Sequence, residues 1–204
     1  YKYKILPDNP IKIKDYDLKK EKKEKINALN KNQCEILFNN LDGKDYYICL
    51  LALKCGLRAG EVVGLTDLSF DFKKGVVIID KQWKKLGHKK HGFGAPKSIN
   101  SYREVPIPSD YILPLKNYIR KCVIGTDRRI FIDATTGTTV NRIRNKMTRL
   151  GLDASLHDLR HTYATTLIAN GVDFQTAAKL LGHNVEQTIK TYSHVTDEML
   201  SKAT

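Results

Sequence analysis

A run of four β-branched residues, Val76-Val77-Ile78-Ile79, lies between long stretches of helical periodicity and constrains the fold more than any other feature. β-branched side chains favour extended backbone, so this run predicts a strand. A second extended segment is predicted over residues 99–107, where the pattern alternates and is stopped by Pro106 and Pro108. The two segments predict a small antiparallel sheet, whose strands are joined by a loop over residues 84–96 rich in Lys, His and Gly.

Most of the remaining chain has helical periodicity, with apolar residues recurring every three or four positions and capping residues at several helix starts. The predicted helices cover residues 31–41, 45–54, 58–65, 111–121, 139–150, 157–169, 174–181 and 185–192, and a last short helix starts at Thr196. The predicted class is therefore mainly α with a small antiparallel β-sheet (α+β), and 204 residues are enough for one such domain.

The N-terminal segment differs in composition from the rest. Residues 1–25 contain nine lysines, five acidic residues and two prolines but few apolar side chains, which is typical of a linker. We expect a basic linker over residues 1–29 and a folded domain over residues 30–204, with Asn30 capping the first helix. The first residue is Tyr1 rather than Met, so we also expect the chain to be a fragment.

The formal net charge of +13 is concentrated in two regions that contain no acidic residue, 81–103 with seven Lys and Arg and 141–149 with four. Clustered positive charge is typical of proteins that bind polyanions, although it also occurs in merely soluble basic proteins. These regions lack the strongly apolar face of a membrane-surface helix, and no apolar run approaches the roughly 20 residues of a membrane span. Nucleic acid is the favoured partner, and the candidate contacts are Lys84, Lys85, Lys89, Lys90, Arg142, Lys146 and Arg149.

Cysteine and histidine patterns give no sign of a metal or a disulfide. The four cysteines form no C-x-x-C pair and have apolar neighbours, as free thiols in a reducing compartment do. His157, His161 and His183 could in principle bind zinc, but there is no H-E-x-x-H motif and nearby arginines would repel a cation. We therefore expect no metal and no other cofactor.

The stretch 157–192 carries groups that could act together on a phosphodiester. His157 and Arg160 are spaced i, i+3, so they share one side of a helix, and His161 lies there too, so spacing alone does not select the imidazole. His183 follows a glycine just beyond a helix, and Tyr192 fits the apolar stripe of the next helix equally well as a core residue. Each feature alone is more often structural than functional.

Two upstream features change this interpretation. The sequence Gly56-Leu57-Arg58-Ala59-Gly60-Glu61 places an arginine at a helix start, with a glutamate positioned to orient it. Lys97 precedes an S-x-R-x-x-P pattern that ends at Pro106. Together with H-x-L-R-H and with Gly-His followed nine residues later by tyrosine, these motifs make residues 30–200 resemble the tyrosine recombinase/phage integrase family. One departure is Asp67 in Gly64-Leu65-Thr66-Asp67, where the family commonly has an aromatic residue.

The resemblance implies a site-specific DNA recombinase, an integrase of a phage or mobile element that integrates or excises it. The implied catalytic residues are Arg58, Lys97, His157, Arg160, His183 and Tyr192. Tyr192 would form a 3′-phosphotyrosyl link without metal or ATP, the arginines and His183 would bind the phosphate, Lys97 would protonate the leaving oxygen and His157 would accept the phenol proton. The alternatives are a type IB topoisomerase and a non-catalytic DNA-binding module.

The resemblance also implies partners. The chain would bind double-stranded DNA at attachment sites, be a monomer when free, and form a homotetramer on DNA by exchanging its tail, residues 193–204, in which Val195, Met199 and Leu200 are apolar. Accessory DNA-bending or directionality proteins are further expected partners. The linker would lead to an N-terminal core-binding domain, and the location would be the cytoplasm of a prokaryotic host, on chromosomal DNA and not at a membrane.

Overall fold

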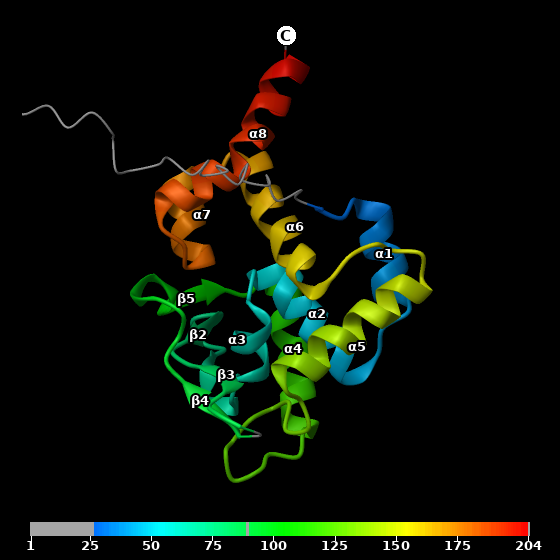
Figure 1. Cartoon of the computed structure of the whole chain (residues 1–204), viewed down its shortest axis with the longest axis vertical. Coiled ribbons are helices and arrows are strands. Elements are labelled where there is room, and N and C mark those ends of the chain that lie inside the picture. Colours follow the sequence, from blue (N-terminus) through cyan, green and yellow to red (C-terminus); the bar gives the residue numbers. More distant parts are fainter. Residues whose placement is uncertain (1–26, 89, 204) are drawn as a thin grey trace, which may run out of the picture.

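The computed structural model describes residues 27–88 and 90–203, and side chains as far as Thr196. It is mainly helical with small antiparallel sheets, which confirms the predicted class (Figure 1). The helices are α1 (Lys31–Asn39), α2 (Gly43–Cys55), α3 (Ala59–Val63), α4 (Ser109–Lys121), α5 (Thr136–Arg149), α6 (Leu156–Ala169), α7 (Phe174–Leu181) and α8 (Val185–Ala203). The strands are β1 (Phe70–Asp71), β2 (Val76–Ile79), β3 (Gln82–Lys85), β4 (His91–Gly94) and β5 (Arg103–Pro106), with 3₁₀ turns η1 (Asp67–Ser69) and η2 (Ile99–Ser101).

Helix α2 lies at the centre of the main core and packs against α6 (Figure 1). Its apolar residues Ile48 to Ala52 are all buried, as expected for a helix that is covered on several sides. The helix ends at Gly56, whose left-handed backbone (φ 63°) turns the chain toward α3. A Cβ atom at this position would overlap the ring of Tyr163 on α6, so the turn and the α2–α6 packing both require glycine.

Replacing Gly56 with alanine is therefore expected to destabilise the fold by about 2–5 kcal/mol. About 1–2 kcal/mol comes from a left-handed backbone with a Cβ, and about 1–3 kcal/mol from overpacking against Tyr163. Urea denaturation measures the loss. Gly151→Ala is the matched control, since Gly151 is also left-handed (φ 73°) but a Cβ there meets nothing within 4 Å. Equal losses in the two variants would show that the contact with Tyr163 is unimportant.

The sheet contains the predicted strand and differs elsewhere from the prediction. β2 lies between β1 and β5, both antiparallel to it, and Val77 is paired with Val105 and also with Phe70. The extended segment predicted over 99–107 is wrong in its first part, because η2 precedes β5 there. The loop predicted over 84–96 is also wrong, because β3 and β4 form a separate hairpin with Trp83 packed edge-on against Phe93.

All the predicted helices are present, and their ends differ from the predicted ones by no more than two residues except in two places. α5 starts one turn earlier than expected, because Thr135 caps it and exchanges hydrogen bonds with Thr138. The two helices predicted on either side of Thr196 are one continuous helix, α8. A short break was expected there because Thr196 can cap a helix, but its hydroxyl donates to the carbonyl of Ser193 instead.

A second, smaller core lies between α6, α7 and α8 and holds Tyr192. Its buried members are Ala164, Ile168, Ala177, Leu181, Tyr192 and Val195. The structure therefore describes the side chain of only one of the three apolar residues expected to take part in tail exchange, Val195, Met199 and Leu200. Val195 packs within its own chain, while the side chains of Met199 and Leu200 lie outside the described residues.

The expected linker, residues 1–29, lies outside the described residues as far as residue 26. Leu29 already belongs to the main core, and its backbone N–H donates to Oγ1 of Thr162 over 2.9 Å. The packed region therefore begins slightly before Asn30. Asn30 caps α1 as predicted and forms a full capping box with Gln33.

Asp67, the departure from the family pattern, forms an ion pair with Arg128 through both carboxylate oxygens. Its backbone N–H also donates to the carbonyl of Arg128 over 3.3 Å. The polar residue is thus accommodated at the surface by a partner 61 residues away, which local sequence could not indicate. Among the described helices, none is long and apolar enough to span a membrane.

Candidate active site

Arg58 stands at the start of α3, where the turn at Gly56 directs it toward α7. The expectation that Glu61 orients this arginine is confirmed. Glu61 accepts a hydrogen bond from the Arg58 backbone N–H over 2.9 Å and another from Nη1 over 2.8 Å. The Arg58 side chain remains 21% exposed, so solvent and a ligand can reach it.

Glu61 also binds a second guanidinium, that of Arg103 on β5. Nη2 and Nη1 of Arg103 donate to the two carboxylate oxygens over 2.9 and 3.1 Å, and Nη1 of Arg160 lies 4.0 Å from the carboxylate. Burial by itself would raise the pKa of Glu61. The hydrogen bonds and charge of Arg103, with the charges of Arg160 and Arg58, outweigh burial and hold that pKa at about 2.

Arg160 projects from α6 into the same network and is almost fully buried, with 1% of its side chain exposed. Its Nη1 donates to the carbonyl of Gly56, and its Nη2 donates to the carbonyl of Leu181. Nη2 also lies 3.0 Å from Nε2 of His183. A buried guanidinium needs such partners, because an unpaired buried charge is very costly.

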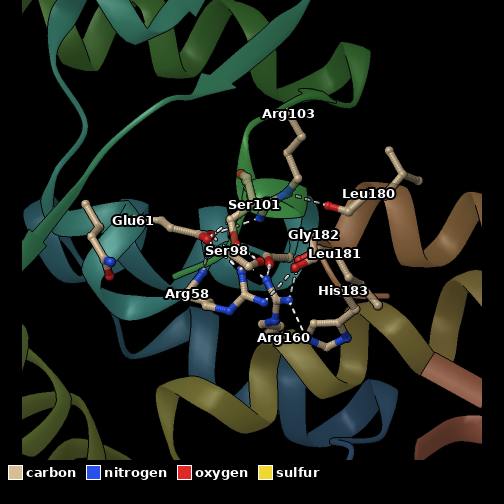
Figure 2. Close-up of polar contacts among 12 residues, drawn as sticks. Arg58, Glu61, Ser98, Ser101, Arg103, Arg160, Leu180, Leu181, Gly182 and His183 are labelled. Carbon is tan, nitrogen blue, oxygen red and sulfur yellow. Dashed lines mark hydrogen bonds and ion pairs between the residues drawn. The ribbon is translucent and has the colours of Figure 1, made fainter. Parts of the chain in front are cut away.

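Three consecutive carbonyls at the end of α7 accept hydrogen bonds from three different arginines (Figure 2). Leu180 accepts from Nε of Arg103 over 2.7 Å, Leu181 from Arg160, and Gly182 from Nη2 of Arg58 over 3.0 Å. The last carbonyls of a helix lack intrahelical partners and carry partial negative charge, which suits them to guanidinium groups. The end of α7 therefore holds the arginines in a fixed arrangement.

Gly182 makes this arrangement sterically possible. It ends α7 with a left-handed backbone (φ 64°), and a Cβ there would lie 3.0 Å from the carbonyl of Asn100 and from Nη1 of Arg103. The close approach brings the chain before β5 against α7. It also places His183 beside Arg160.

His183 is a neutral imidazole in this site. Burial, followed by the charges of Arg160, Arg58 and Arg103, lowers its pKa to about 3. Because a guanidinium can only donate, Nε2 of His183 accepts from Arg160 and the ring proton lies on Nδ1. That Nδ1 is buried and has no hydrogen-bond partner among the described residues.

Tyr192 is enclosed by the smaller core, with 0% of the residue exposed. Its hydroxyl lies 2.7 Å from Nδ1 of His161, so a hydrogen bond joins the two side chains. Burial raises the pKa of Tyr192 to about 12, although the charges of Arg160 and Arg58 act in the opposite direction. The phenol is therefore protonated at neutral pH.

His157 lies at the exposed start of α6 and meets His161 rather than Tyr192. The two imidazole rings are edge-on with centroids 4.4 Å apart. Partial burial lowers the pKa of His157 to about 4, with smaller contributions from His161 and Arg160. His157 is thus neutral at pH 7 and can accept a proton.

Lys97 is exposed on the connection between β4 and η2, not on a strand of the hairpin. Its neighbour Ser98 lies 3.1 Å from Ser101, oxygen to oxygen, and Oγ of Ser101 accepts from Arg58 over 3.5 Å. Through these serines the backbone that carries Lys97 is tied to the arginine cluster (Figure 2).

The DNA-contact candidates have different surroundings. Lys84, Lys85, Lys90 and Arg149 are exposed, while Lys89 lies outside the described residues. The premise that the basic face of α5 lacks an acidic partner is wrong: Asp45 of α2 is 2.7 Å from both Arg142 and Lys146. Burial would raise the pKa of Asp45, but these two cations lower it overall. Their charge is thus partly committed within the fold.

Sequence reasoning missed two residues of the site. Arg103 was part of a recognised motif but had no assigned role, and its burial depends on Glu61, 42 residues away. His161 was left undecided beside His157, because both lie on the same side of α6. No group of three or more His, Cys, Asp or Glu side chains that could hold a metal occurs in the described part of the chain.

Comparison with known proteins places this arrangement in a family. The model of the phage integrase family matches residues 19–199. A tyrosine recombinase XerC-like protein of Caldanaerobacter subterraneus subsp. tengcongensis is 33% identical over 187 residues, covering 76% of this chain and 46% of that protein. Tyrosine recombinase XerA of Thermococcus onnurineus is 32% identical over 167 residues, covering 78% of this chain and 54% of the relative.

Solved structures show the same fold at lower identity. The Tn1549 transposon integrase in complex with circular intermediate DNA has a TM-score of 0.67 at 20% identity, covering 89% of this chain and 68% of that one. XerA recombinase has a TM-score of 0.67 at 22% identity, and the match covers 87% of this chain and 63% of that one. The chain spans about half the length of the curated relatives it matches. It has a tyrosine recombinase catalytic-domain fold and belongs to the phage integrase family.

Proposed function

We propose that this chain is the catalytic domain of a site-specific DNA recombinase, which cleaves and rejoins DNA strands to integrate or excise a phage or mobile element. The observation that carries the proposal is the gathering of Arg58, Arg160 and His183 around the end of α7. Paired guanidiniums bind the non-bridging oxygens of a phosphate, and a preorganised cluster stabilises the charge that develops in the transition state. Family membership supports the same activity.

In the proposed reaction, the oxygen of Tyr192 attacks the phosphorus and forms a 3′-phosphotyrosyl bond, while the bond from phosphorus to the 5′-oxygen breaks. His157, whose imidazole is neutral at pH 7, accepts the phenol proton, and Lys97 donates a proton to the departing oxygen. The covalent bond preserves the free energy needed for religation, so neither ATP nor a metal is required. The unpartnered Nδ1 of His183 supports its assignment to phosphate binding.

The proposal extends to partners. Lys84, Lys85, Lys89, Lys90 and Arg149, with a smaller share from Arg142 and Lys146, would contact the DNA backbone, and such contacts give steeply salt-dependent affinity. The end of α8 projects from the rest of the fold (Figure 1), which supports tail exchange in a tetramer of chains that are monomers when free. An N-terminal core-binding domain, joined through the linker of residues 1–29, and accessory proteins that set direction complete the proposed system, which acts on chromosomal DNA in the cytoplasm of a prokaryotic host.

A covalent capture experiment tests the function. The chain is incubated with nicked duplexes of randomised sequence and with fragmented genomic DNA of its source, and SDS-resistant adducts are purified and sequenced. We expect an adduct through a 3′-phosphate, unaffected by EDTA and reduced by added salt. DNA binding without any adduct would instead indicate a non-catalytic binding module. Relaxation of supercoiled plasmid without strand exchange between sites would indicate a type IB topoisomerase.

A further inference from the structure

The position of Tyr192 is incompatible with attack on a phosphodiester. Its side chain has no exposed surface, because α6, α7 and α8 enclose it. An attacking oxygen must come within roughly 3–3.5 Å of the reacting atom, and a DNA phosphate can approach only from solvent. The phenol must therefore leave this packing before it reacts.

His161 is the group that stabilises the enclosed position. The ring of Tyr192 packs in the apolar smaller core, and Nδ1 of His161 is the hydrogen-bond partner of its hydroxyl, so loss of His161 would remove that partner from a buried polar group. His161, Ala164 and Ile168 are spaced i, i+3 and i+7, so one face of α6 supplies both the hydrogen bond and the apolar contacts. Release of Tyr192 must break that hydrogen bond.

We propose that His161 is a positioning residue for the nucleophile, and that its hydrogen bond to Tyr192 holds the phenol in the enclosed position until DNA binds. The proposal rests on the proposed function only in taking Tyr192 as the nucleophile. It assigns different tasks to two adjacent imidazoles. His161 restrains the phenol, and His157, exposed at the start of α6, is left to accept its proton after release.

A proton-accepting role for His161 is the competing interpretation, since 2.7 Å also suits proton transfer. The burial of Tyr192 argues against this role. Burial raises the pKa of Tyr192, so ionisation is least favourable in the position where His161 contacts it. Ionised there, the phenolate would have no route to a phosphate.

Two variants separate these roles. His161→Phe keeps an aromatic ring, somewhat larger than imidazole, and removes the hydrogen bond, while His161→Asn places an amide near the position of Nδ1 and can restore it. The DNA-free chain is treated with tetranitromethane, and nitration of each tyrosine is quantified by peptide mass spectrometry. Tyr102, which is 48% exposed, serves as an internal reference.

We expect Tyr192 of the wild type to be nitrated far more slowly than Tyr102. In His161→Phe the rate at Tyr192 should rise roughly fivefold to tenfold, the factor expected for loss of one ordinary hydrogen bond. His161→Asn should remain close to the wild type. Unchanged nitration of Tyr192 in His161→Phe, with the fold intact by circular dichroism, would overturn the proposal.

Adduct formation in single turnover provides the second measurement. We expect His161→Phe to form the adduct at least as fast as the wild type, because the enclosed position is less populated. Loss of more than tenfold in this variant would identify His161 as the proton acceptor and refute the positioning role. If the wild type itself forms no adduct, the proposed function fails, whereas the nitration result still decides whether His161 restrains Tyr192.

Discussion

Tyr192→Phe is expected to abolish the covalent DNA adduct, with a residual rate lower by about 10⁵-fold or more. The substitution removes only the phenolic oxygen, and no other group can form the same bond from the same position. The ring still fills the space between α6, α7 and α8. The loss of one hydrogen bond to His161 should lower stability by only about 1 kcal/mol.

The measurement is SDS-resistant adduct formation on a nicked substrate, with noncovalent DNA affinity measured in parallel. Affinity is expected to change by no more than about fivefold, because Tyr192 is buried in the free chain and the substitution removes only one ordinary hydrogen bond. Tyr102→Phe is the control, since this exposed tyrosine lies beside η2, close to the arginine cluster. An adduct that persists in Tyr192→Phe and disappears in Tyr102→Phe would show that the nucleophile is misassigned.

The main features of the fold could be predicted because they depend on local patterns. The β-branched run gives β2, and the apolar, uncharged interior of α2 identifies the central helix. The hairpin of β3 and β4 could not be predicted, because the residues Gln82-Trp83-Lys84-Lys85 do not alternate between apolar and polar and the partner strand contains two glycines. That hairpin depends on tertiary contacts, including the guanidinium of Arg129 stacked 3.5 Å from the centre of the Trp83 ring.

The site was predictable to the extent that motifs identify side chains. Arg58, Arg160 and His183 are brought together as the family pattern implies. The carbonyls that hold these arginines could not be predicted, because every residue has a carbonyl and every helix end leaves several without intrahelical partners. The pairing of Asp45 with Arg142 joins residues 97 apart and was equally invisible, which is why the basic face of α5 was overestimated.

Glu61→Gln is expected to destabilise the fold by about 3–5 kcal/mol. This single carboxylate binds Arg58 and Arg103 and lies 4.0 Å from Arg160. Glutamine would leave the two buried cations, Arg103 and Arg160, without this counter-charge. The amide group also places an N–H against an arginine N–H. Urea denaturation measures the loss, and Glu104→Gln, an exposed carboxylate on β5, should change stability by less than about 0.5 kcal/mol.

The same carboxylate should make stability depend on pH. The pKa of Glu61 is about 2 in the folded chain against an ordinary value of 4.5, so the unfolded chain takes up the proton first as pH falls. The ionised Glu61 carboxylate therefore contributes about 3 kcal/mol to the free energy of unfolding. This contribution is complete above pH 5 and is lost as the pH falls toward 2. Denaturation midpoints measured between pH 6 and pH 3 should converge for wild type and Glu61→Gln. Parallel curves would show that Glu61 is not the group responsible.

Cleavage should fall further than stability explains, because Glu61 fixes the direction of Arg58. With the Nη1 contact weakened, the guanidinium keeps only its bonds to Gly182 and Ser101 and is less well oriented toward a phosphate. We expect single-turnover adduct formation to drop by about 10²–10³, the effect of losing one donor from a preorganised site, in conditions where the variant is fully folded. A folded Glu61→Gln variant that cleaves at the wild-type rate would show that Arg58 is held well enough by α7 alone, and that the carboxylate serves stability only.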